Sequence, residues 1–194
     1  MSAGPRVILL DSNAYFRLAL SVRPLLAEKF GDHPLWSLMV LEDLDKEFSR
    51  NQRLRSKFSW LTDKEYIRDR GDSRYCPRGT TSKSVGQAFS YLAAQAEELM
   101  IDVSPVDLRV LAVGHARAFP VVTDDKGMQT LAAVFRIECW PTLELLHVML
   151  NCGRIDIGKV REVVEYWDAD NDLPTSLRGF RDLYRETFKE DCPI

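Results

Sequence analysis

The sequence predicts an α/β fold in three layers, with helices on both faces of a central, mostly parallel sheet, and a C-terminal helical extension. Short apolar runs alternate with stretches of helical periodicity over residues 6 to 150 of the 194-residue chain. This alternation is typical of parallel strands joined by helices. The composition, 45% hydrophobic and 28% charged, excludes a largely disordered chain.

The four predicted strands are apolar runs bounded by polar, Gly or Pro residues. The first is Arg6–Leu10, and the others fall within 35–41, 119–123 and 135–140. Helices are predicted over residues 13–23, 42–48, 87–100, 104–118, 128–133 and 142–150, with a broken helix and a loop between 50 and 83.

The chain divides into a domain over 1–154 and an extension over 155–194. In the extension, apolar residues such as Val160, Val163, Val164 and Trp167 recur at helical spacing. We expect two amphipathic helices there, packed on the domain or on a partner.

Membrane and secreted classes are not expected. No apolar run approaches the roughly 20 residues of a membrane span, and the first residues lack the features of a signal peptide. The four cysteines, at 76, 139, 152 and 192, form no C-x-x-C pair, which argues against a zinc module or a disulfide framework. We therefore expect a cytoplasmic protein with free thiols.

A basic segment interrupts an otherwise acidic chain. Residues 50–83 carry ten Lys and Arg against four Asp and Glu, while the whole chain has a net charge of −3. Such a segment is either a solvated surface or a track for a phosphate backbone. Trp60, Tyr66 and Tyr75 lie within it and either stack on unpaired bases or pack internally. The candidate nucleic-acid-binding residues are Arg50, Arg53, Arg55, Lys57, Arg74, Arg78 and Lys83.

Acidic residues follow the predicted strands. Asp11 ends the first strand, Glu42 and Asp43 follow the second, and Asp124 and Asp125 follow the third, while Asp107 opens a helix. Each alone is explained by a helix cap or a turn. However, the carboxyl ends of parallel strands share one sheet edge, so these groups should converge. Oxygen ligands without His or Cys at ligand spacing favour Mg²⁺ or Mn²⁺ over zinc.

Four blocks of sequence resemble the PIN domain family of metal-dependent nucleases, which includes VapC-type toxins. These blocks, in the family's order, are VILLDSN (7–13), VLEDLDK (40–46), DLRVLA (107–112) and VVTDD (121–125). The resemblance implies a PIN-like nuclease domain over 1–154 that hydrolyses phosphodiester bonds.

The resemblance assigns the site residues one by one. It implies catalytic, metal-binding roles for Asp11, Asp43, Asp107 and Asp125, and supporting roles for Asn13, Glu42, Thr123 and Asp124. The second acid of the family is usually Glu, so Glu42 and Asp43 both stay candidates for that position. Asp124 is the weaker candidate of the doubled acid.

The implied function is that of an endoribonuclease dependent on Mg²⁺ or Mn²⁺, acting as the toxin of a toxin–antitoxin pair. An RNA-processing or DNA-cutting nuclease of the same fold is one alternative. A catalytically idle PIN-like module that binds RNA or protein is another. The expected partners are an RNA substrate and either an antitoxin protein or a second copy in a homodimer, with no membrane.

Overall fold

A parallel sheet of four short strands forms the centre of the molecule. The computed structural model describes residues 4–77 and 82–194. In it, β1 (Arg6–Leu10), β2 (Trp36–Met39), β3 (Val121–Val122) and β4 (Cys139–Trp140) pair in the order β2-β1-β3-β4. All three pairings are parallel. The predicted parallel sheet is therefore confirmed.

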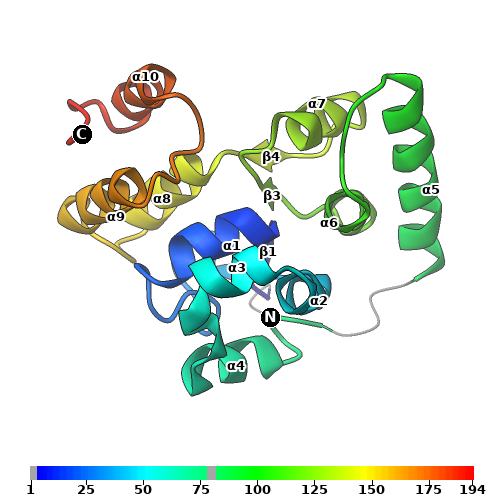
Figure 1. Ribbon diagram of the computed structural model, residues 1–194, viewed down its shortest axis with the longest axis horizontal. Coiled ribbons are helices and arrows are strands. Elements are labelled where there is room, and N and C mark those ends of the chain that lie inside the picture. The colour runs from blue at the N-terminus through cyan, green and yellow to red at the C-terminus, as the bar shows by residue number, and fades with distance from the viewer. Residues whose placement is uncertain (1–3, 78–81) are drawn as a thin grey trace.

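Helices cover both faces of this sheet, as predicted. Successive strand residues point to opposite faces, so that Ile8 and Leu10 lie in one buried cluster and Leu9 in a second. Figure 1 shows the strands between two groups of helices. The first cluster is covered by α1 (Ser12–Ala19), α8 (Thr142–Asn151), α9 (Ile157–Ala169) and α10 (Leu177–Phe188), and the second by α5 (Lys83–Glu98), α6 (Pro105–Arg117) and α7 (Lys126–Val134).

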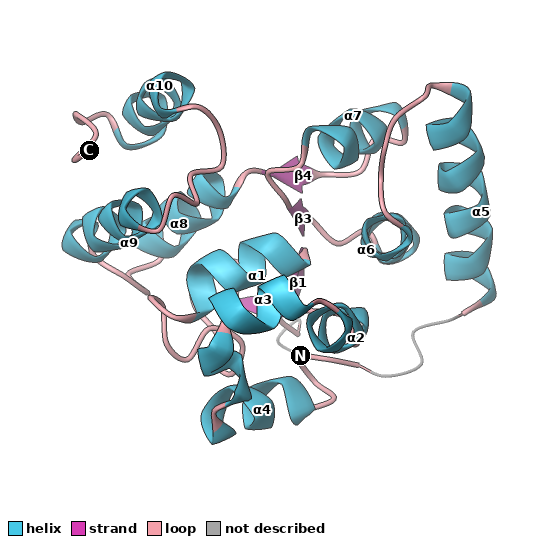
Figure 2. Cartoon of the chain, in the orientation of Figure 1, coloured by secondary structure: helices cyan, strands magenta, loops and turns pink. Residues whose placement is uncertain are grey.

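The basic segment forms several short helices, as the predicted broken helix suggested (Figure 2). Helix α2 (Asp43–Arg50) ends where the segment begins, and α3 (Gln52–Lys57), η1 (Ser59–Thr62) and α4 (Lys64–Gly71) lie within it. The chain bends at Asn51, whose backbone is extended and whose Oδ1 accepts hydrogen bonds from the N–H groups of Arg53 and Leu54. Asparagine favours this position because its side chain satisfies N–H groups that a new helix leaves without partners.

Several predicted boundaries differ from the observed ones, and two of the differences have a visible cause. Helix α1 ends at Ala19, before the predicted break near residue 23. Helix α5 begins at Lys83 rather than at 87, because the Ser82 hydroxyl caps it by accepting a hydrogen bond from the Val85 N–H. Strand β4 is shorter than predicted, since the N–H of Ile137 still bonds to Ala132 at the end of α7.

The C-terminal helices pack on the sheet domain. Val160, Val163, Val164 and Trp167 of α9 are fully buried, together with Phe180 and Tyr184 of α10. All six lie in the same cluster as Ile8 and Leu10 of β1. The sequence did not decide whether these helices pack on the domain or on a partner. In the structure they pack on the domain and cover its core.

Two further features concern the chain as a whole. No helix in residues 4–77 and 82–194 combines the length and the apolar character needed to cross a bilayer. Cys76, Cys139, Cys152 and Cys192 are all free thiols, as expected from their spacing.

Candidate functional site

Asp11 occupies the end of β1, at the junction of the sheet and α1. Its N–H donates to the carbonyl of Val122 at 3.1 Å, and its Oδ1 caps α1 by accepting from the Ala14 N–H at 2.6 Å. The residue is only 1% exposed. The pKa of Asp11 is raised to about 7, mainly by burial. Hydrogen bonds from Thr123 and Ala14 oppose this rise, and the charges of Asp124 and Asp107 add to it.

The turn after β3 brings a hydroxyl and a carboxylate to the same edge. Thr123 is fully buried, and its Oγ1 accepts a hydrogen bond from the N–H of Asp125 at 3.1 Å. The Oδ1 of Asp125 caps α7 by accepting from the Met128 N–H at 2.7 Å. Thr123 thus connects the buried Asp11 with the exposed Asp125.

Asp124 is engaged in structural contacts. Its Oδ2 forms an ion pair of 2.8 Å with Nη1 of Arg17 and accepts from the hydroxyl of Thr142, while its Oδ1 accepts from the Thr142 N–H at 3.0 Å. These contacts join α1 to the start of α8. Asp125 therefore remains the better candidate of the doubled acid.

Asp107 lies in the first turn of α6, beside its N-cap. The Ser104 hydroxyl donates to Asp107 Oδ2 at 2.8 Å, and Ser104 Oγ lies 3.2 Å from the Asp107 N–H. The predicted cap is therefore present. Burial raises the pKa of Asp107, hydrogen bonds with Ser104 lower it, and the negative charges of Glu47 and Asp125 raise it.

The second acid position, Glu42 or Asp43, has more charged neighbours than the sequence suggested. Asp43 is buried and lies near two cations, with Oδ1 3.6 Å from Lys46 Nζ and Oδ2 3.5 Å from Arg109 Nε. Glu42 lies 3.3 Å from the same Lys46. The α2 acid whose charge acts on Asp107 is Glu47.

Glu47 and Arg109 are functional candidates that the sequence analysis missed. A signal for Glu47 existed, since it lies four residues after Asp43 and so on the same face of α2. Arg109 gave no such signal, because only the packing of α6 against α2 brings its guanidinium to Asp43. Asn13, predicted to support Asp11, is exposed in the first turn of α1.

These carboxylates form an electrostatically coupled group without forming a complete metal cage. The charges of Asp107 and Asp124 act on Asp11, and those of Glu47 and Asp125 act on Asp107. Within residues 4–77 and 82–194, no three acidic, His or Cys side chains are arranged to hold a metal ion. The donors are nevertheless the hard oxygen ligands that suit Mg²⁺ and Mn²⁺, and a cation would offset their mutual repulsion.

A groove of about 600 Å³ lies between α2, the start of α3 and the start of α6. Asp43 and Glu47 of α2 and Ser104 beside Asp107 line one part, and Arg50 and Arg53 line another. Neither arginine forms an ion pair with any residue in the described part of the chain. The groove therefore joins carboxylates to guanidinium groups that are available to an anion.

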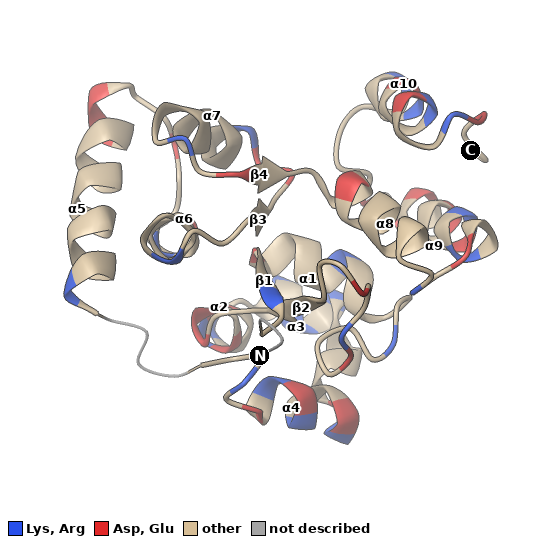
Figure 3. Cartoon of the chain, turned by 180° about the vertical axis from the view of Figure 1, so that it is seen from behind, with Lys and Arg blue, Asp and Glu red and all other residues tan. Residues whose placement is uncertain are grey.

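The other predicted basic residues differ in their availability. Lys57 pairs with Asp170 at 3.2 Å and Asp172 at 3.1 Å, and Arg74 pairs with Asp72 at 2.6 Å. Arg55 and Lys83 are exposed, and Arg78 lies outside the described residues. In Figure 3, α4 carries acidic as well as basic residues. The segment is thus a less continuous basic track than its composition suggested.

The aromatic residues of the segment pack internally. Tyr66 and Tyr75 are only 4% and 6% exposed. Trp60 is half-buried, and its ring centroid lies 4.6 Å from that of Tyr66. Of the two predicted uses, internal packing is the observed one.

Comparison of the sequence with models of protein families and with curated proteins gives no match.

Proposed function

We propose that this protein is a PIN-like endoribonuclease that depends on Mg²⁺ or Mn²⁺. The observation that carries the proposal is the groove that runs from Asp43, Glu47 and Ser104 to Arg50 and Arg53. Carboxylates suit a divalent cation, and unpaired arginines suit the phosphates of a strand. One groove that contains both supports phosphodiester hydrolysis.

The residues of the chain have distinct roles in this proposal. Arg50 and Arg53 bind backbone phosphates and place the strand along α2. Asp11, Asp43, Asp107 and Asp125 would hold the cation; Asp43 lines the groove, and Asp107 is bonded to Ser104 at its wall. Thr123 and Ser104 would orient these acids through their hydroxyls. The cation, when bound, stabilises the charge that develops on the phosphate during cleavage.

The biological role that we propose is that of a toxin in a toxin–antitoxin pair, with an antitoxin protein as its partner. RNA processing or DNA cleavage uses the same site chemistry, so the target has to be determined directly. The test is cleavage of single-stranded and structured RNA and of DNA, in Mg²⁺, Mn²⁺ or EDTA, by the wild type and by Asp11→Asn. We expect RNA cleavage that requires the cation and is lost in the variant.

A binding module without catalysis is the second candidate. It is favoured by the contacts of Asp43 with Lys46 and Arg109, which already partner a carboxylate that was predicted to bind the cation. RNA binding that weakens with salt, together with no cleavage in either metal, would reject the nuclease and support this module.

A further inference from the structure

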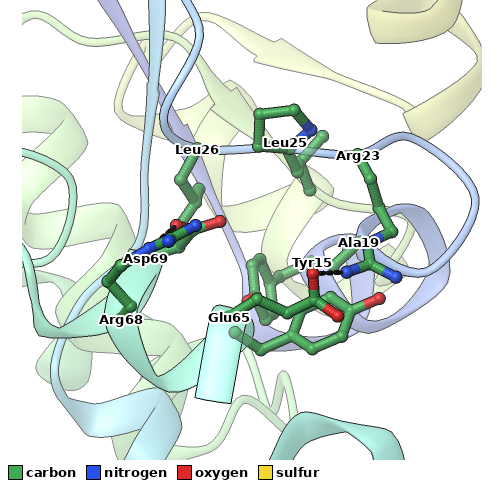
Figure 4. A pocket seen from close by; sticks show the side chains of 10 residues that line it. Tyr15, Ala19, Arg23, Leu25, Leu26, Glu65, Arg68 and Asp69 are labelled. Atoms are coloured by element: carbon green, nitrogen blue, oxygen red, sulfur yellow. Dashed lines mark ion pairs between the residues drawn. The ribbon is translucent and has the colours of Figure 1, made fainter. Parts of the chain in front are cut away.

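A cavity of about 290 Å³ lies between α1, the loop after it and α4. Its lining contains none of the carboxylates of the candidate site. Leu25 and Leu26 contribute apolar walls, and two ion pairs, Arg23–Glu65 and Arg68–Asp69, lie on opposite sides of it (Figure 4). The cavity thus combines apolar surface with hydrogen-bond donors and acceptors, as small-molecule sites do.

One polar group in the lining residues has no partner. Tyr66 is only 4% exposed. Its hydroxyl is buried and forms no hydrogen bond within the described chain. Buried hydroxyls are normally satisfied. The guanidinium of Arg23 lies over the same ring, 4.7 Å from its centroid, and guanidinium planes are surfaces on which bases stack.

The second ion pair is loosely held. Arg68 Nε lies 3.6 Å from Asp69 Oδ1, and the side chains are 78% and 14% exposed. The distance exceeds that of a charge-assisted hydrogen bond. The exposed Arg68 guanidinium and the largely buried Asp69 carboxylate therefore line the cavity as a separate donor and acceptor.

This set of groups matches one nucleobase better than the others. Guanine presents two acceptors, O6 and N7, which suit an arginine, and beside them the N1–H and N2–H donors, which suit a carboxylate. Adenine and the pyrimidines do not offer this combination. We propose that the cavity recognises a guanine base, which, if the proposed function holds, is an unpaired guanine of the RNA strand.

The cavity is fixed relative to the candidate active site. Tyr15 lines it and lies on α1, one turn after Asp11. Arg70 of α4 is buried and pairs with Asp45 of α2 at 2.7 Å, while its Nη2 donates to the Leu61 carbonyl at 3.0 Å. Helices α1 and α2 therefore connect the cavity with the candidate site.

The test is equilibrium binding of GMP, IMP, AMP, CMP and UMP by calorimetry, in EDTA so that no cleavage enters. We expect GMP to bind about tenfold or more tightly than AMP, CMP and UMP. IMP lacks the N2 amino group and should bind with intermediate affinity. Asp69→Asn should abolish the preference for GMP.

Asp63→Asn is the matched control, because Asp63 is an exposed acid that caps the same helix without a side-chain hydrogen bond and does not line the cavity. Circular dichroism checks that each variant is folded. Equal affinity for all nucleotides, or a preference that survives Asp69→Asn, overturns the proposal.

A uridine hexamer with one guanosine tests whether the base comes from an RNA strand or from a free nucleotide. Displacement of GMP by this hexamer, but not by the all-uridine one, supports a strand site, whereas GMP binding without displacement overturns it. This experiment measures binding and no cleavage, so its outcome does not depend on nuclease activity. If the protein binds guanine but cleaves no RNA, only the proposed function is rejected.

Discussion

At the scale of single residues, Asp11 has the most perturbed environment of the candidate site. Burial raises its pKa to about 7, whereas an unfolded aspartate has a pKa near 4. The folded state therefore binds a proton more tightly than the unfolded state does. The free energy of unfolding of the protein must therefore fall as the pH rises from about 4 to about 7.

Asp11→Asn should remove this pH dependence while keeping the cap of α1, because asparagine is an equally good N-cap. We expect the variant to match the wild type near pH 4, to gain up to about 1.4 kcal/mol per pH unit between about pH 4 and pH 7, and to gain no more above that range. Urea unfolding at several pH values in EDTA measures this gain. A variant that is no more stable than the wild type at pH 8 would contradict the raised pKa of the buried Asp11 carboxyl.

Glu47 and Asp107 provide a second prediction at this scale. The charge of Glu47 raises the pKa of Asp107, so Glu47→Gln should lower that pKa by removing a like charge. Carbon-detected NMR titration of the Asp107 carboxyl measures the change. Glu42→Gln is the matched control, with the same chemistry in the preceding turn, and we expect it to change that pKa less. An equal effect of both variants would argue against Glu47 as part of the coupled group.

At the scale of elements, α2 and α3 form the wall that joins the acids to the arginines. If Arg50 and Arg53 bind phosphates, their joint replacement by glutamine should weaken RNA binding for all sequences alike. It should also reduce the slope of log affinity against log salt by about 1.4, since each single-strand phosphate contact contributes about 0.7.

The control for this pair is Arg55→Gln with Lys83→Gln, two exposed residues that do not line the groove. The slopes come from fluorescence anisotropy with a labelled single-stranded RNA at several salt concentrations. If the control pair reduced the slope as much as the groove pair, binding would depend on the overall charge of the segment rather than on the groove.

The elements also show how far sequence reasoning extends. The four strands and most helices were predictable, because apolar periodicity and capping residues such as Ser104 act locally. The placement of Asp11 and Asp125 after neighbouring strands, at one edge of the sheet, followed from the parallel pairing of β1 with β3. The contacts of Asp124 with Arg17 and Thr142 could not be predicted in this way, because both partners lie far from Asp124 in sequence.

At the scale of the whole molecule, the C-terminal helices complete the core that holds α1 in place. The indole N–H of Trp167 donates to the carbonyl of Arg17 at 3.0 Å, and Arg17 also pairs with Asp172 at 3.2 Å. Helical periodicity predicted these helices, but it could not tell which surface they cover. The burial of Trp167 against α1 supplies that information.

Trp167 therefore offers a test of the whole fold. It is fully buried, and truncation of such a large side chain costs about 3–5 kcal/mol. We expect Trp167→Ala to lower the free energy of unfolding by this amount, and Tyr166→Ala, at a 38% exposed neighbour, to change it by less than about 1 kcal/mol.

Urea unfolding followed by circular dichroism and by tryptophan fluorescence distinguishes the possible outcomes. If α9 and α10 share one core with the sheet, both probes should report a single transition that Trp167→Ala shifts as a whole. If the helices formed a separate unit, the variant would instead show an early transition that leaves the remaining structure folded. Since Arg17 links α9 to Asp124 at the end of β3, only the first outcome is compatible with a site whose geometry depends on the complete chain.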